Sequence, residues 1–288
     1  MATGQVAITR ERRFAPRLIG SGGASLAIGG SMLALLVIAA VFAPQLAPHG
    51  PDEIDFAVKL EGPSWSHPFG TDSLGQDIFS RVMYGARTSL VVALAVVAGS
   101  VAIGVPLGVA AGLAGGRLDM AIMRLADVFL AFPPLLLPLA VAAALGGSLL
   151  NAMLAIIVSW FPWYVRLARA QVLTVKQNLY IQAARSMGVS TLVTARRHVL
   201  PNIAGPIFVQ ASLDFGYAIL TAAGLSFLGL GAKPPDIEWG LMVTLARAQF
   251  LDYWWVATFP GLAIFFAVVA FNLVGDGLRD RLDPRRGA

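Results

Sequence analysis

Residues 89–113 read SLVVALAVVAGSVAIGVPLGVAAGL, a run of 25 residues without a charged side chain. A helix of about 20 mainly apolar residues crosses the roughly 30 Å hydrocarbon core of a bilayer. The run is longer than an ordinary strand and lacks the alternation of a membrane barrel. It therefore predicts a helix that spans a membrane.

Five more apolar runs predict further spans: residues 26–42, 128–145, 149–165, 203–225 and 254–273. Residues 146–148 are all that separates the third span from the fourth, so these two helices must be antiparallel neighbours. The first run has a second interpretation as a signal peptide, which Pro44 disfavours because it would directly follow the cleavage site. We expect an all-α membrane protein with six transmembrane helices.

The composition excludes several classes of protein. Hydrophobic residues make up 57% of the 288 residues and charged residues 13%, against about 45–50% and about 25% in soluble domains. A chain this apolar is neither soluble nor disordered. Because it has no cysteine, it also has no disulfide framework and no cysteine-ligated metal.

The distribution of charge predicts the orientation in the membrane. Sixteen of the 21 Lys and Arg residues fall in segments 1–25, 114–127, 166–202 and 274–288, whereas segments 43–88 and 226–253 hold five. Cytoplasmic loops are the ones enriched in Lys and Arg. We therefore expect both termini in the cytoplasm and external loops at 43–88 and 226–253. The net charge of +5 then follows from topology, which argues against nucleic-acid binding.

The longest predicted cytoplasmic loop, residues 166–202, has six basic residues and no acidic one. Loops of this length usually have a function of their own. Residues 175–187 have helical spacing, and Gly188 is a suitable helix stop. A second helical stretch at 191–200 leads into Pro201. Composition alone leaves open an ordinary interfacial helix that is attracted to anionic membrane lipid.

The spacing of small residues in this loop resembles a known signature. Gln182-Ala183-Ala184, Gly188 and Leu200-Pro201 are spaced as in the EAA loop of membrane subunits of ATP-binding-cassette importers. Gln182 replaces the usual Glu and His198 the usual Ile, so an ion pair made by that Glu is not expected here. The resemblance implies a coupling helix, including Tyr180, that docks on an ATPase subunit. The small Ala183-Ala184 surface would let that subunit approach the backbone closely.

The chain lacks the residues of an ATPase. No Gly-x-x-x-x-Gly-Lys-Ser/Thr phosphate loop occurs in it, so we expect ATP and Mg to bind to separate ATPase subunits. The three histidines lie outside the predicted spans, and no convergent set of His, Asp and Glu lies within them. We expect no catalysis, cofactor or metal in this chain.

Motifs along nearly the whole chain resemble one branch of these importers, the C-type membrane subunit of dipeptide, oligopeptide and nickel permeases. In order they are HPFGTD at 67–72, LGQD at 74–77, GAR at 85–87, LSFLGLG at 225–231, WG at 239–240 and FNLVGDGLRD at 271–280. The resemblance implies a type I importer permease of the bacterial inner membrane, with a permease domain at 26–285, an N-terminal segment at 1–25 and a tail at 286–288. It implies ATP-driven uptake of di- or oligopeptides or related solutes. The implied partners are a second homologous permease, two ATP-binding subunits and an extracytoplasmic solute-binding protein.

Asp214 is the only charged residue inside a predicted span. Such groups are costly in a membrane and face the bundle interior or water. Asp214 either lines the substrate pathway or makes a buried hydrogen bond, with Asn151, Ser212 or a partner subunit as the candidates. The near absence of intramembrane charge argues against the rival class, an ATP-independent secondary transporter or channel.

Local patterns make four smaller predictions. Gly99, Gly104, Gly108 and Gly112 form a ridge typical of helix packing in membranes. Kinked or widened spans are predicted at Pro106, Pro133-Pro134, Pro138 and Pro260. Asp72 and Asp77, beside Gly70 and Gly75, predict caps and turns in a folded external loop. Trp239, Tyr253, Trp254 and Trp255 predict anchors at the membrane interface.

Overall fold

Helices account for most of the chain in the computed structural model, which describes residues 22–282. In chain order they are α1 (Gly22–Val41), α2 (Ala43–Leu46), η1 (Phe56–Val58), α3 (Ile78–Ala114), α4 (Gly116–Leu130), α5 (Leu136–Leu145), α6 (Leu149–Val175), α7 (Leu179–Ser186), α8 (Thr191–Thr194), η2 (Ala195–Val199), α9 (Leu200–Phe227), α10 (Trp239–Ala246) and α11 (Trp255–Leu282). Within residues 22–282, strand-like pairing is limited to one bridge between Thr71 and Asp77. The all-α prediction is confirmed. The N-terminal segment before residue 22 and the tail at 286–288 lie outside the described residues.

Five helices are long and apolar enough to cross a membrane: α1, α3, α6, α11 and the continuous helical stretch Thr191–Phe227 that ends with α9. The sixth apolar helix, α5, has ten residues and is therefore only about 15 Å long. The six apolar segments predicted from the sequence thus become five long helices and one short one.

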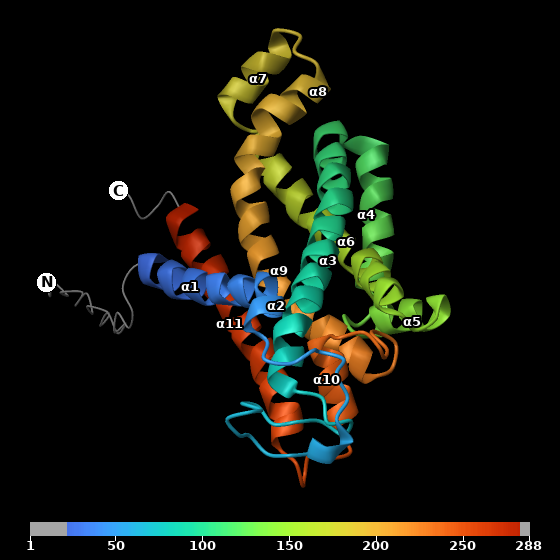
Figure 1. Ribbon diagram of the computed structural model, residues 1–288. Helices are drawn as coiled ribbons and strands as arrows, with labels where there is room; N and C mark the ends of the chain where they lie inside the picture. Colours follow the sequence, from blue (N-terminus) through green and yellow to red (C-terminus); the bar gives the residue numbers. More distant parts are fainter. Residues whose placement is uncertain (1–21, 283–288) are drawn as a thin grey trace, which may run out of the picture.

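The third predicted span, residues 128–145, is broken. α4 ends at Leu130, α5 begins at Leu136, and Figure 1 shows α5 turned away from the direction of α4. Pro133 and Pro134 lie in the break, and proline both lacks the N–H that continues a helix and clashes with the preceding turn. The prediction of one continuous helix is therefore wrong, whereas the predicted kink is confirmed.

The glycine ridge of α3 packs closely against α6. A Cβ atom at Gly104 would lie 2.5 Å from the Phe161 carbonyl oxygen and 2.5 Å from Tyr164 Cβ, and one at Gly112 would lie 2.7 Å from Val172 Cβ. All three contacts are with α6, and Gly108 is equally crowded by that helix. The predicted packing face is confirmed: the absence of side chains lets the α3 and α6 backbones approach.

A short buried helix interrupts the predicted external loop 226–253. α10 packs against α3, α9 and α11, and Glu238 caps its start by accepting hydrogen bonds from Gly240 N (2.8 Å) and Leu241 N (2.9 Å). Trp239 is fully buried, and its Nε1 donates to the Val82 carbonyl at 2.9 Å. The prediction of Trp239 as an interfacial anchor is therefore wrong, because its indole fills the space beside Gly85 of α3.

The segment between α1 and α3 is folded, as its turn and cap residues predict. Asp77 caps α3 by accepting a hydrogen bond from Ser80 N at 2.7 Å. Asp72 Oδ1 accepts from Leu74 N (2.8 Å) and Gln76 N (3.0 Å), and Gly75 adopts a positive φ of 75° between them. Figure 1 places this segment at the opposite end of the molecule from α7 and α8. The predicted external and cytoplasmic loops therefore lie far apart.

Candidate functional site

A cavity of about 630 Å³ lies among α4, α5, α6 and α9. The break after α4 forms part of its wall, so the two prolines that divide the predicted span also shape the cavity. Its lining is Phe129, Leu130, Phe132, Pro133, Pro134, Leu137, Ser159, Trp160, Trp163, Tyr164, Arg166, Leu167, Gln210, Asp214 and Tyr217. Binding sites for small molecules typically have volumes of about 300–1,000 Å³, mostly apolar walls and a few polar groups. This cavity has that size and character.

Asp214 is the acidic group of the cavity wall, and both of its carboxylate oxygens are hydrogen-bonded. The Tyr164 hydroxyl on α6 donates to Oδ2 at 2.6 Å, and Gln210 Nε2, one turn earlier on α9, donates to Oδ1 at 2.9 Å. A carboxylate has about four lone-pair sites, so it can still accept from a ligand. Asp214 thus makes a hydrogen bond between two helices and also lines the cavity.

Two of the three hydrogen-bond partners suggested for Asp214 from the sequence, Asn151 and Ser212, are wrong. Asn151 Nδ2 donates to the carbonyls of Leu145 and Gly146, and the Ser212 hydroxyl donates to the Phe208 carbonyl within its own helix. Tyr164 lies on α6, as Asn151 does, but it faces Asp214 because of how α6 packs on α9, which the sequence does not reveal. The contact with Gln210 could have been predicted from the sequence, because residues four apart on a helix share a face.

Aromatic rings form much of the remaining wall. Trp160 and Tyr217 are stacked with ring centroids 5.4 Å apart, and Trp163 is 60% exposed. Aromatic faces attract cations that lie within about 6 Å of the ring centre. The wall therefore offers a carboxylate together with π surfaces, a combination suited to an ammonium group beside an apolar side chain.

Two ion pairs join α4 to α6 beside the cavity. Arg166 Nη2 lies 2.5 Å from Asp127 Oδ1, and both side chains are nearly half exposed. Further along, Arg169 forms a bidentate ion pair with Asp119: Nε donates to Oδ1 at 2.5 Å and Nη2 donates to Oδ2 at 2.7 Å. Asp119 lies near the start of α4, outside the five long apolar helices, and the hydrogen bond from Arg169 lowers the pKa of its carboxyl. These pairs fix α4 against α6 and place one cationic group, Arg166, in the cavity wall.

The predicted coupling segment projects from one end of the molecule (Figure 1). Residues 166–175 continue α6 and residues 191–202 belong to the helical stretch leading into α9, which leaves 176–190 as the projecting part. Its helix begins at Leu179 rather than at residue 175, because α6 ends there and a turn follows. Gly188 has φ of 78°, the left-handed conformation expected of a helix stop.

The two alanines of the signature face opposite ways. Ala183 is exposed, together with Leu179, Tyr180, Gln182 and Met187, whereas Ala184 is only 6% exposed. The expectation that both alanines form one accessible surface is therefore wrong: Ala184 packs inward beside Ile181, which is fully buried and was not identified from the sequence.

The end of the signature leads into α9. His198 lies in the π-helical turn η2, 6.1 Å from the Tyr180 ring between centroids. Leu200 and Pro201 occupy the first turn of α9 and are exposed, while Val199 between them and His198 is fully buried. Val199 and Ile181 belong to one buried cluster with Tyr164 of α6, so the projecting segment rests on the same packing as the cavity tyrosine.

Residues 104–287 match the protein family described as the binding-protein-dependent transport system inner membrane component. The chain belongs to this family. Residues 26–63 also match the N-terminal transmembrane domain of oligopeptide transport permease C. These matches confirm the resemblance drawn from the motifs: the chain is a permease component of an ATP-binding-cassette importer in the bacterial inner membrane.

Curated relatives match nearly the full length of this permease. A probable D,D-dipeptide transport system permease protein of Escherichia coli is 49% identical over 256 residues, covering 89% of this chain and 86% of the relative. A dipeptide transport system permease protein of Alkalihalophilus pseudofirmus is 44% identical and covers 90% and 85% of the two chains. A glutathione transport system permease protein of Shigella flexneri is 48% identical, with 87% and 83% covered.

Proposed function

We propose that this permease, paired with a second homologous permease, forms the pathway for ATP-driven uptake of di- or oligopeptides or closely related solutes. The relatives named for dipeptide and glutathione transport support this substrate class. The excess of Lys and Arg in segments 1–25, 166–202 and 274–288 supports a cytoplasmic location for both termini and for α7. Exposed apolar side chains on α1, α9 and α11 then contact lipid or the second permease.

The observation that carries this proposal is the Asp214 carboxylate in the wall of the cavity. A peptide has an ammonium group at one end, which a carboxylate binds through charge-assisted hydrogen bonds. Trp160 and Tyr217 add aromatic faces for the same group or for an apolar side chain. Tyr164 and Gln210 hold the carboxylate in a fixed position, so little has to be ordered when a peptide arrives.

We further propose that α7 docks on an ATPase subunit. Leu179 and Ala183 on α7 and Met187, directly after its end, are spaced four residues apart and are all exposed, so they form one apolar surface on this segment. Such a face fits a groove in a partner protein. Two ATPase subunits, one for each permease, would bind ATP and Mg, and this chain would bind neither. A solute-binding protein would dock at the opposite end, on the segment between α1 and α3.

The test is uptake into proteoliposomes that contain the full complex purified from its native membrane. We expect accumulation of a radiolabelled dipeptide that requires the solute-binding protein outside and ATP inside. A complex with its ATPase subunits stripped away should show no uptake. Dipeptide accumulation that persists without ATP and without ATPase subunits would instead establish the secondary transporter or channel.

A further inference from the structure

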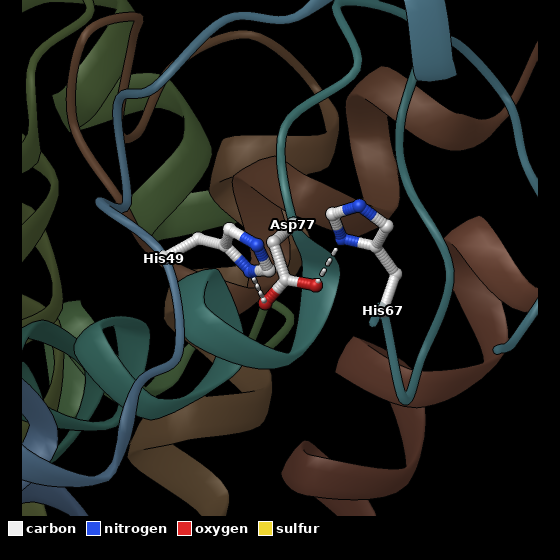
Figure 2. A group of neighbouring side chains, drawn as sticks. All are labelled: His49, His67 and Asp77. Atoms are coloured by element: carbon white, nitrogen blue, oxygen red, sulfur yellow. Dashed lines mark hydrogen bonds and ion pairs between the residues drawn. The ribbon is translucent and has the colours of Figure 1, made fainter. Parts of the chain in front are cut away.

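Two of the three histidines of the chain meet one carboxylate at the end of the molecule opposite α7. His49 follows α2, His67 lies in the loop that follows η1, and Asp77 caps the start of α3. Figure 2 shows both imidazole rings turning a nitrogen toward the Asp77 carboxylate. One ligand atom from each residue falls within a group whose members all lie within 4.8 Å of one another. His67 and Asp77 are buried, and His49 is partly buried.

The hydrogen bonding of this cluster is incomplete at one atom. His67 Nδ1 donates to Asp77 Oδ1 at 3.1 Å, while Asp77 Oδ2 accepts from Ser80 N and Ser80 Oγ at 2.7 and 2.6 Å. His49 Nδ1 is enclosed but has no hydrogen-bond partner, and the nearest carboxylate oxygen lies 4.0 Å away. A buried polar atom without a partner calls for an explanation, such as an ion or a water molecule.

We propose that His49, His67 and Asp77 bind a divalent transition-metal ion of the zinc class. Imidazole nitrogens and a carboxylate oxygen are ligands that zinc prefers, at about 2.0–2.2 Å. Two such atoms on a tetrahedral ion lie about 3.3 Å apart. The His67 Nδ1–Asp77 Oδ1 separation of 3.1 Å is close to that spacing. His49 Nδ1 lies 4.0 Å from the other oxygen, Oδ2, and one ligand atom from each residue falls within 4.8 Å of the others, so the His49 side chain has to rotate toward Oδ1 to complete the set.

The surroundings of the cluster suit a bound ion. The metal replaces the proton that His67 Nδ1 donates to Oδ1, while Oδ2 keeps its two hydrogen bonds from Ser80. Hydrogen bonds that orient a ligating carboxylate are the usual outer layer of a metal site. Three protein ligands leave one position of a tetrahedral ion for water. The ion thereby links the irregular segment that contains His49 and His67 to Asp77, the N-cap residue of α3.

A purely structural His67–Asp77 hydrogen bond is the competing explanation. It accounts for His67 and Asp77, since together they fix the loop to the helix start. It leaves the His49 ring without a role, although this ring lies 4.6 Å from the His67 ring between centroids and turns its free nitrogen inward. The two explanations therefore differ in what they assign to His49.

The test is zinc binding to the full-length permease, purified in detergent with an affinity tag that contains no histidine. The chain suits this measurement because it has three histidines and no cysteine. Equilibrium dialysis against Zn²⁺ gives stoichiometry and affinity, and Co²⁺ as a probe gives an absorption band whose intensity distinguishes tetrahedral from octahedral coordination. We expect one ion per chain with saturable binding at micromolar Zn²⁺.

His49→Gln is the decisive variant. The imidazole Nδ1 of His49 makes no hydrogen bond, and the bond from its backbone N to Ser80 Oγ (3.2 Å) does not need the ring, so the fold should survive. Loss of this ligand should weaken Zn²⁺ binding by more than about 100-fold, because loss of an outer-layer partner already costs about 10–100-fold. His198→Gln, at the other end of the molecule, is the matched control and should bind as the wild type does.

Two results would overturn the metal site. One is the absence of saturable binding to the wild type, and the other is an unchanged affinity in His49→Gln, which would leave the structural hydrogen bond as the whole account. A third measurement guards against misfolding: zinc should raise the unfolding temperature of the wild type and of His198→Gln but not of His49→Gln. This proposal does not depend on peptide uptake, so either can fail alone.

Discussion

The Tyr164 hydroxyl and Asp214 Oδ2 lie 2.6 Å apart and join α6 to α9 across the wall of the cavity. The same carboxylate is therefore a structural link and the acidic group that faces the cavity. These roles can be separated, because the link needs an acceptor oxygen whereas attraction for an ammonium group needs the negative charge.

Asp214→Asn tests the charge. Asparagine keeps one acceptor oxygen for Tyr164 but loses the charge-assisted bond, which is worth about 1.5–3 kcal/mol. Dipeptide uptake at subsaturating concentration should fall about 10–100-fold, while the unfolding temperature changes little. The initial rate of dipeptide uptake into proteoliposomes measures this effect. If the variant complex assembles normally and transports at the wild-type rate, Asp214 does not bind substrate in the pathway.

Tyr164→Phe is the matched variant that removes the link and keeps the charge. The loss of one hydrogen bond should lower stability by about 1 kcal/mol. The expected result is a lower unfolding temperature in detergent with uptake largely retained. If uptake instead collapses as far as in Asp214→Asn, the tyrosine itself takes part in binding.

Ala183→Trp tests the exposed face of α7. The side chain projects outward, so the indole should block docking without disturbing the buried cluster beneath. We expect ATP-driven uptake to be lost while the permease keeps its wild-type unfolding temperature. Ala183→Ser is the control and should transport normally. Full transport by the tryptophan variant would show that no partner contacts this face.

Ile181→Ala tests how α7 is held. Ile181 is fully buried within the cluster that contains Val199 and Tyr164, and truncating a buried isoleucine to alanine typically costs about 2–5 kcal/mol. Limited proteolysis should cut residues 176–190 faster than in the wild type. An unchanged cleavage rate would mean that other contacts hold the segment.

Gly104→Ala tests the packing of α3 on α6. The new methyl group would meet the Phe161 carbonyl oxygen and Tyr164 Cβ at 2.5 Å, and backbone cannot yield as a flexible side chain does. Overpacking of this kind typically costs about 1–3 kcal/mol, so the unfolding temperature should fall. A Cβ atom at Gly224 of α9 would have no neighbour within 4 Å, so Gly224→Ala should leave the unfolding temperature unchanged or raise it. Equal effects of the two substitutions would contradict the packing argument.

The features that could be predicted from the sequence are those set by nearby residues. The apolar runs, the cap at Asp77, the stop at Gly188 and the kink at Pro133-Pro134 all follow from local chemistry. The glycine ridge of α3 is a repeating pattern on one helix, which is also visible without the partner helix.

The features that were missed depend on residues far apart in the chain. Trp239 is buried because Gly85, on a different helix, leaves room for its ring. Asp214 pairs with Tyr164, fifty residues away. The inward face of α7, with Ala184 and Ile181, is set by packing of Ile181 in a cluster that holds Tyr164 of α6. Neither the composition nor the spacing within one segment contains these relationships.

The break between α4 and α5 also fixes the shape of the cavity wall. In an unbroken helix the Leu130 carbonyl would accept from the N–H four residues later, but residue 134 is proline and has none. Pro133 and Pro134 line the cavity at this break, and proline holds its φ near −65°. This part of the wall therefore cannot refold into a continuous helix when the cavity is filled or emptied.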